Sequence, residues 1–111
     1  MTDLATAAFR TVGRADAVAD GAVEPYYLGD RKLRVSIARV DGRLYAFDDL
    51  CTCASPACPL SSGLLTGTTV MCQCHGSRFD LATGAAITGP ATEALRVYEV
   101  QEIAGELQIR A

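Results

Sequence analysis

The sequence predicts an all-β fold, an antiparallel sandwich or barrel. Along most of the chain apolar and polar residues alternate with a period of two, as in strands that bury one face. Turn residues such as Asp-Gly and Thr-Gly separate these runs at intervals of about eight to twelve residues. No segment keeps an apolar stripe of the helical period, about 3.6 residues, for long. The 111 residues contain no linker or repeat, so the whole chain, 1–111, is expected to form one domain.

The first elements follow from local pattern. Residues 15–19 predict only a short helical turn, and residues 23–28 predict a strand that ends at Gly29-Asp30. A second strand follows at once, and in it every second residue is apolar. Those apolar side chains, Leu33, Val35 and Ile37, are expected to face the core. The polar side chains between them, Arg34 and Ser36, are expected to face water.

Asp41-Gly42 then predicts a tight hairpin turn, because glycine accepts the positive φ that such turns require. Residues 43–47 are the expected return strand. Four tyrosines are expected to keep their hydroxyl groups at the surface. They are Tyr26, Tyr27, Tyr45 and Tyr98. Further strands are expected at residues 67–72, 77–81, 85–88, 95–100 and 106–109.

Three segments without a period are expected to be loops at one end of this scaffold: residues 50–63, 73–76 and 89–91. Prolines in the first and third remove backbone donors and argue against strands there. Asp48 and Asp49, directly before the first loop, are expected to be solvated. Together the loops could enclose a ligand.

The composition excludes several classes of function. The net charge of −3 and the lack of any basic run argue against a nucleic-acid partner. The first residues show neither a signal peptide nor a membrane span, so a cytoplasmic protein without a membrane partner is expected. We find no nucleophile with a base and no phosphate-binding loop. The chain is therefore not expected to be an enzyme.

All five cysteines lie between Cys51 and Cys74, and the only histidine, His75, follows them directly. Cys51-x-Cys53 and Cys72-x-x-His75 are separated by eighteen residues, which places two ligand pairs on two of the expected loops. Thiolate and imidazole together suit either zinc or an iron-sulfur cluster. The donor types alone leave both open.

The runs YAFDDLCTCASPACPLSSG and VMCQCHGSRFDLATGAAITGPATEALRVYEV resemble the Rieske 2Fe-2S proteins. In that family the ligands are Cys-x-His on one loop and Cys-x-x-His on another. The resemblance implies a Rieske-like antiparallel β fold with a cluster-binding part at about residues 48–91, and one 2Fe-2S cluster as cofactor. It also implies that Gly76, Ser77 and Pro90 lie beside the cluster, with Ser77 as a donor to sulfur.

One position departs from the family, because Cys53 stands where the first ligand histidine is expected. Carried over by position, Cys51 and Cys72 would hold one iron, and Cys53 and His75 the other. A thiolate in place of imidazole adds a negative charge, which should lower the reduction potential toward the lower end of the Rieske range, about −150 mV, or below it.

The two remaining cysteines, Cys58 and Cys74, resemble the pair that forms a disulfide between the two cluster loops in respiratory and photosynthetic Rieske proteins. The resemblance therefore implies a Cys58–Cys74 disulfide, although Cys58 lies two residues further from the first ligand box than in the usual pattern.

The function implied is that of a soluble Rieske-type ferredoxin, which carries single electrons from a flavin-dependent or similar reductase to an oxygenase or another terminal enzyme. Other functions fit part of the pattern. A Cys3His 2Fe-2S protein could transfer its cluster or sense redox state. A Rieske-like small subunit of a nitrite reductase often lacks the ligands that this chain retains. A structural zinc module would use the same donor types but would be colourless.

Overall fold

The computed structural model describes residues 9–29, 32–50, 59–74, 76–89 and 93–110. Over these residues the chain forms strands and two short 3₁₀ helices and no α-helix, which confirms the predicted all-β class. The strands are β1 (Phe9–Arg14), β2 (Val23–Leu28), β3 (Leu33–Val40), β4 (Arg43–Asp48), β5 (Leu64–Thr66), β6 (Thr69–Met71), β7 (Arg78–Asp80), β8 (Ala86–Thr88), β9 (Val97–Ile103) and β10 (Glu106–Arg110). The 3₁₀ helices are η2 (Ala15–Ala17) and η3 (Leu60–Ser62). None of the helices described could span a membrane, because none is long and apolar enough.

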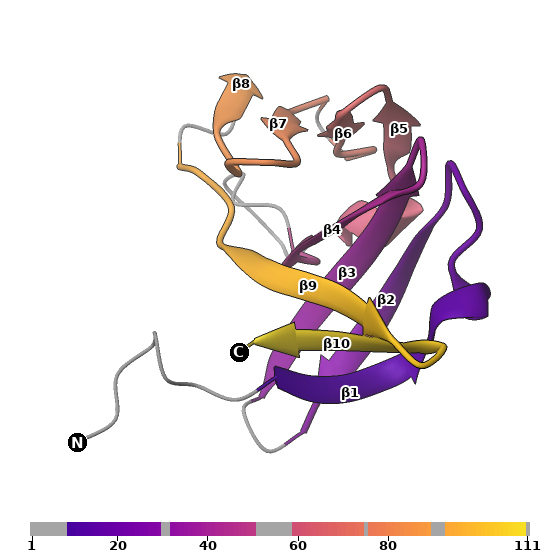
Figure 1. Cartoon of the computed structure of the whole chain (residues 1–111). Coiled ribbons are helices and arrows are strands. Elements are labelled where there is room, and N and C mark those ends of the chain that lie inside the picture. Colours follow the sequence, from indigo (N-terminus) through magenta and orange to yellow (C-terminus); the bar gives the residue numbers. More distant parts are fainter. Residues whose placement is uncertain (1–8, 30–31, 51–58, 75, 90–92, 111) are drawn as a thin grey trace.

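Six strands form an antiparallel sheet in the order β1-β10-β9-β4-β3-β2, the lower body in Figure 1. This sheet curls until its outer strands, β1 and β2, approach each other and nearly close a barrel. At this seam Gly13 of β1 lies against Tyr26 of β2, and a Cβ atom on Gly13 would lie 2.8 Å from Cε1 of the ring. Glycine therefore allows the two outer strands to meet.

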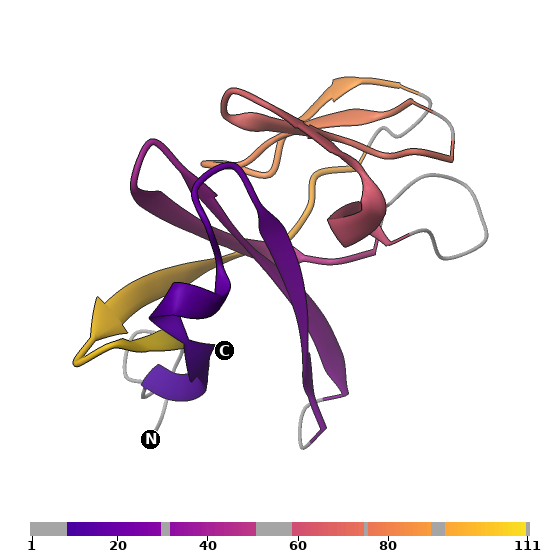
Figure 2. The same cartoon turned by 90° about the vertical axis from the view of Figure 1, so that its right-hand side faces the viewer.

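The other four strands form a smaller antiparallel sheet in the order β5-β6-β7-β8. It lies above the barrel in both views (Figures 1 and 2). The chain enters this sheet from β4 through η3 and leaves it from β8 to β9. The described residues between 48 and 91, where the resemblance implies the cluster-binding part, include η3 and this smaller sheet.

The molecule has two hydrophobic cores. The barrel core is built from Ala15, Val18, Leu28, Val35, Ile37, Ala46, Leu107 and Ile109. The second core joins the barrel to the smaller sheet and is built from Ala38, Phe47, Leu60, Val70, Cys72, Phe79, Leu81 and Leu95. Because the smaller sheet covers one side of the barrel, strands β3 and β4 contribute side chains to both cores.

This two-sided burial makes one prediction wrong. Val35 and Ile37 face the barrel core as expected, but Ser36 between them is also fully buried. On the face of β3 that was expected to meet water, Arg34 is exposed as expected, whereas Ser36 lies against Asp49 and Ala38 belongs to the core under the smaller sheet. A polar residue in an alternating strand is normally a sign of exposure, so the alternation alone could not show this second layer.

Other differences concern element boundaries. The strand expected at 67–72 is shorter in the structure, where β6 covers 69–71 and Gly67, with a φ of +57°, lies in the turn before it. Strand β5, which pairs with β6 across this turn, was not predicted. Strand β1 was not predicted, because its partner β10 lies at the other end of the chain. Part of the loop expected at 50–63 forms η3 instead.

Tyr98 corrects the expectation that every tyrosine hydroxyl lies at the surface. Its hydroxyl is partly buried and donates to Oδ1 of Asp48 at 2.6 Å. Burial, followed by this hydrogen bond and the charge of Asp48, raises the pKa of Tyr98 to about 12. Tyr27, in contrast, is 67% exposed.

Alkaline titration tests this raised pKa. The folded protein holds the Tyr98 proton more tightly than the unfolded chain, whose tyrosines ionise near 10.0. The resulting stabilisation is present below pH 10 and is expected to be lost as the pH rises toward 12. Burial and the charge of Glu24 also raise the pKa of Tyr26, so Tyr98→Phe should remove from the late tyrosinate absorbance only the part that belongs to Tyr98. Superimposable titrations of the two proteins in this range would contradict the assignment.

Candidate metal centre

The second loop, residues 72–77, is closed by two backbone hydrogen bonds between its ends. The Cys72 N–H donates to the Ser77 carbonyl at 2.8 Å, and the Gly76 N–H donates to the Cys72 carbonyl at 2.9 Å. Gly76 has a φ of +80°, which favours glycine, and open space surrounds its missing Cβ. The tight turn therefore needs glycine for its backbone conformation and holds Cys72 beside Ser77.

Cys72 and Ser77 are both fully buried. Cys72 directly follows β6, and its side chain belongs to the second core beside Phe79 and Leu60. The thiol of Cys72 therefore lies at the inner end of the loop and not at its surface. Cys74 takes part in a disulfide bond.

The first loop is closed at its base. Leu50 and Pro59 form an isolated antiparallel bridge, which joins the two ends of the segment 51–58. One residue further from the loop on each side, the Leu60 N–H donates to the Asp49 carbonyl at 2.5 Å. The two loop ends are thus held side by side where β4 ends and η3 begins.

Asp49 was expected in a solvated loop, and this expectation is wrong. Its side chain is fully buried. Oδ1 accepts hydrogen bonds from the Ser36 hydroxyl and, at 2.7 Å, from the Ser61 N–H, while Oδ2 pairs with the Arg34 guanidinium. The sequence held one signal for this burial: the period of two along β4 places Asp49 on the same side as the core residue Phe47.

Gly63 brings η3 against β6. A Cβ atom on Gly63 would lie 2.1 Å from the Met71 carbonyl oxygen and 3.1 Å from the Leu60 carbonyl oxygen. Met71 immediately precedes Cys72. The segment after the first loop therefore packs backbone to backbone against the residue before the Cys72 thiol, and the bases of the two loops lie together.

The structure places the predicted site residues as follows. Cys72, Cys74, Gly76 and Ser77 lie within the described residues, all on the second loop. The other predicted ligands and neighbours lie outside the described residues: Cys51, Cys53, Cys58, His75 and Pro90. Among the residues described, no three His, Cys, Asp or Glu side chains gather into a metal site. The ligand set therefore stays a prediction.

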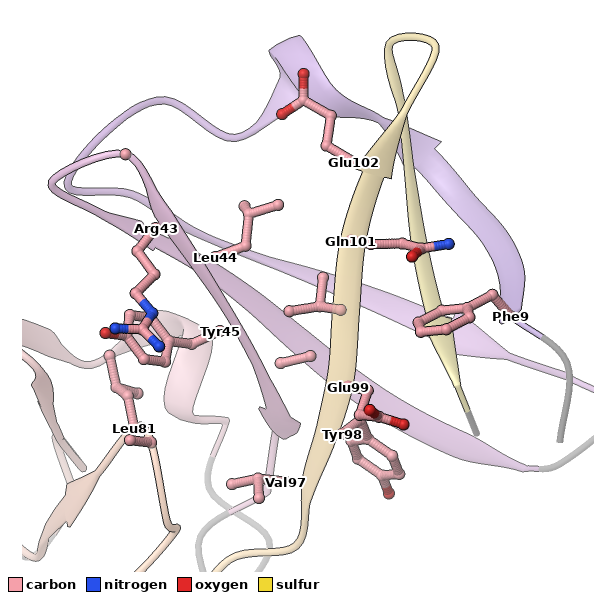
Figure 3. Close-up of a pocket in the computed structure, with 14 residues that line it drawn as sticks. Phe9, Arg43, Leu44, Tyr45, Leu81, Val97, Tyr98, Glu99, Gln101 and Glu102 are labelled. Carbon is pink, nitrogen blue, oxygen red and sulfur yellow. The ribbon is translucent and has the colours of Figure 1, made fainter. Parts of the chain in front are cut away.

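A groove on the barrel is separate from these loops (Figure 3). It has a volume of about 660 Å³ and opens between β4 and β9, which pair only at Ala46–Tyr98 and Phe47–Val97. Arg43 lies over the Tyr45 ring at its rim, 5.9 Å from the centroid. No cysteine or histidine lines this groove, so it offers no thiolate or imidazole ligand for a cluster.

The donors that the structure does describe fit an iron-sulfur cluster. A fully buried thiol on a hydrogen-bonded loop, with a buried serine five positions later, is the environment that thiolate ligation and hydrogen bonding to sulfur require. The base of the Cys51–Cys53 segment lies against the same core through Leu60.

Comparisons with known proteins agree with this fit. The chain is 37% identical over 67 residues to the ferredoxin component of the naphthalene 1,2-dioxygenase system of Pseudomonas aeruginosa, which covers 60% of this chain and 62% of that protein. The chain thus matches less than two thirds of the length of this curated relative. Among solved structures it is similar to the Sphingomonas yanoikuyae B1 ferredoxin, with a TM-score of 0.83, 28% identity and coverage of 94% and 99% of the two chains.

A second solved structure is a chain from the complex of reduced oxygenase and oxidized ferredoxin in carbazole 1,9a-dioxygenase. Its TM-score is 0.80 and its identity 28%, with 92% of each chain covered. The family model of the Rieske [2Fe-2S] domain matches residues 8–99, which is most of the sequence. The chain therefore belongs to the Rieske [2Fe-2S] domain family, and one 2Fe-2S cluster is its cofactor.

Proposed function

We propose that this protein is the ferredoxin of an oxygenase system, which accepts one electron from a reductase and delivers it to a terminal oxygenase. The observation that carries the proposal is the likeness, over nearly the whole chain, to a chain of the oxygenase–ferredoxin complex of carbazole 1,9a-dioxygenase. The curated relative in the naphthalene system is likewise a ferredoxin component and not the oxygenase itself. We propose a flavin-dependent or similar reductase as the donor.

The proposed ligands are Cys51 and Cys72 on one iron, and Cys53 and His75 on the other. The bound cluster supplies one-electron redox chemistry. Burial of Cys72 supports this assignment, because a buried loop end keeps water from that side of the site. A cytoplasmic location is part of the proposal.

Within the site, Ser77 is proposed to donate to a cluster sulfur, and Gly76 and Pro90 to line the site. The burial of Ser77 next to the hydrogen-bonded turn supports its role. Hydrogen bonds to sulfur favour the more negative, reduced state.

Iron and sulfide analysis combined with electron paramagnetic resonance tests the cofactor and its ligands. The purified protein should contain two irons and two sulfides per chain, as one 2Fe-2S cluster requires. After reduction with dithionite it should give a paramagnetic signal with coupling to one ligand nitrogen. A colourless, silent zinc protein would overturn the proposal.

Reconstitution with a reductase and an oxygenase tests the direction of electron flow. Catalytic amounts of this protein should support turnover by the oxygenase, whereas rapid loss of the cluster to an apo-acceptor would favour cluster transfer instead.

The disulfide gives a separate prediction. Cys74 is disulfide-bonded, and we propose Cys58 as its partner. A cross-link that closes a loop of about this length stabilises a domain by about 3 kcal/mol. Cys58→Ala and Cys74→Ala should each lower the free energy of unfolding by about this amount, and the double variant by no more than either single one. Additive losses in denaturant unfolding would exclude this pairing.

A further inference from the structure

The Asp49 carboxylate connects three segments that are distant in sequence. Strand β3 reaches it through the Ser36 hydroxyl and the Arg34 guanidinium, and η3 reaches it through the Ser61 N–H. Asp49 itself directly follows β4, and its own N–H donates to the Arg34 carbonyl at 2.9 Å. A buried carboxylate is costly unless it is paired and hydrogen-bonded, and here both oxygens have partners.

These contacts include both ends of the first loop. Asp49 lies two residues before Cys51, and its carbonyl and side chain bind the N–H groups of Leu60 and Ser61 beyond the loop. Asp49 therefore holds the loop ends together beside the Leu50–Pro59 bridge, and Asp49 is anchored to β3 of the barrel. If η3 moved away, the buried Oδ1 would lose its Ser61 donor.

The anchor also reaches the second loop. Leu60, whose N–H binds Asp49, is fully buried in the same core as Cys72. Gly63, at the end of η3, lies against the Met71 carbonyl, one residue before Cys72. A displacement at Asp49 would therefore pass through η3 to the base of the second loop.

We propose that Asp49 is a positioning residue for the cluster site, which fixes the first ligand loop against β3 and in register with the Cys72 loop. The inference rests on the proposed ligands Cys51 and Cys53. Arg34 and Ser36 orient the carboxylate, and Arg34 offsets its charge. The role is geometric, since Asp49 acts through the backbone of the ligand loop and through η3.

Asp49→Asn, compared with Asp48→Asn, tests the proposal. The neighbouring Asp48 is a matched control, because it accepts from the Tyr98 hydroxyl and makes no contact with η3 among the described hydrogen bonds. In Asp49→Asn the carboxamide NH₂ or oxygen would face the Arg34 guanidinium without an ion pair. We expect the Leu60 and Ser61 amides to exchange hydrogen about tenfold faster, while the Leu107 amide in β10 keeps its rate.

The second measurement uses the protein with its 2Fe-2S cluster bound. Asp49→Asn should change the paramagnetic g-values and the reduction potential and shorten the half-life of the cluster, whereas Asp48→Asn should leave all three unchanged. Ser36→Ala, which keeps the carboxylate and removes one of its partners, should shift the same quantities in the same direction to a smaller extent. Ser36→Ala replaces Asp49→Asn as the test if Asp49→Asn does not fold.

Unchanged exchange at Leu60 and Ser61 in Asp49→Asn, or equal shifts in g-values and potential for Asp49→Asn and Asp48→Asn, would overturn the inference. Failure of the proposed function looks different, since the parent protein would then not support turnover by the oxygenase, whatever the exchange rates and g-values of the variants. The exchange comparison does not need the cluster and still decides the role of Asp49 in that case.

Discussion

Gly63→Ala is expected to destabilise the protein by about 3 kcal/mol, at the upper end of the usual cost of overpacking. The added Cβ would lie 2.1 Å from the Met71 carbonyl oxygen, and a backbone atom cannot turn aside as a flexible side chain could. Either η3 or the end of β6 must move, and both moves disturb the position of Cys72. Denaturant unfolding and the iron content of the purified protein measure the two consequences.

Gly29→Ala is the matched control for this substitution. Its Cβ would lie 3.7 Å from the nearest atom, Cε2 of Tyr27, which is an ordinary contact distance. This variant should unfold within about 0.5 kcal/mol of the parent and keep its iron. Equal stability of the Gly63→Ala and Gly29→Ala proteins would show that η3 is not held against β6 as described.

Cys53→His is expected to raise the reduction potential by on the order of 100 mV. All-cysteine plant-type clusters lie near about −400 mV and the lowest Rieske centres near about −150 mV, and two cysteine-to-histidine exchanges separate these classes. One exchange should therefore account for about half of that difference, because it removes one thiolate charge from the site. Redox titration followed by absorbance measures the shift.

Thr52→His is the control, since it introduces an imidazole into the same segment but at a position that is not a proposed ligand. Its potential and g-values should match those of the parent. If Cys53→His also left the spectrum and the potential unchanged, Cys53 could not be a ligand, and the Cys3His assignment would be wrong.

Local signals in the sequence were sufficient for some elements and not for others. The hairpin of β3 and β4 was predictable, because alternation and the Asp41-Gly42 turn are encoded within a few residues. Strand β1 was not, because it depends on β10 at the far end of the chain. Strand β5 was missed because it is only three residues long and shows no clear alternation, whereas its partner β6 lies within the strand expected at 67–72.

For the site, the loop at residues 73–76 was predictable because that segment has no strand period, whereas the resemblance to the Rieske proteins implied Gly76 and Ser77 as neighbours of the cluster, which stays a prediction. The role of Asp49 was not. Two consecutive aspartates beside a loop normally indicate solvent exposure, and the partners of Asp49 come from β3 and η3, on either side of it in the chain. Only the presence of the smaller sheet over the barrel makes a buried carboxylate possible there.

Strand β3 belongs to both cores, with Val35 and Ile37 in one and Ala38 in the other. If either the barrel or the smaller sheet unfolded alone, β3 would lose its contacts with one of the two cores. Calorimetry should accordingly record a single cooperative transition. A protein in which the smaller sheet has unfolded should therefore have lost the barrel as well.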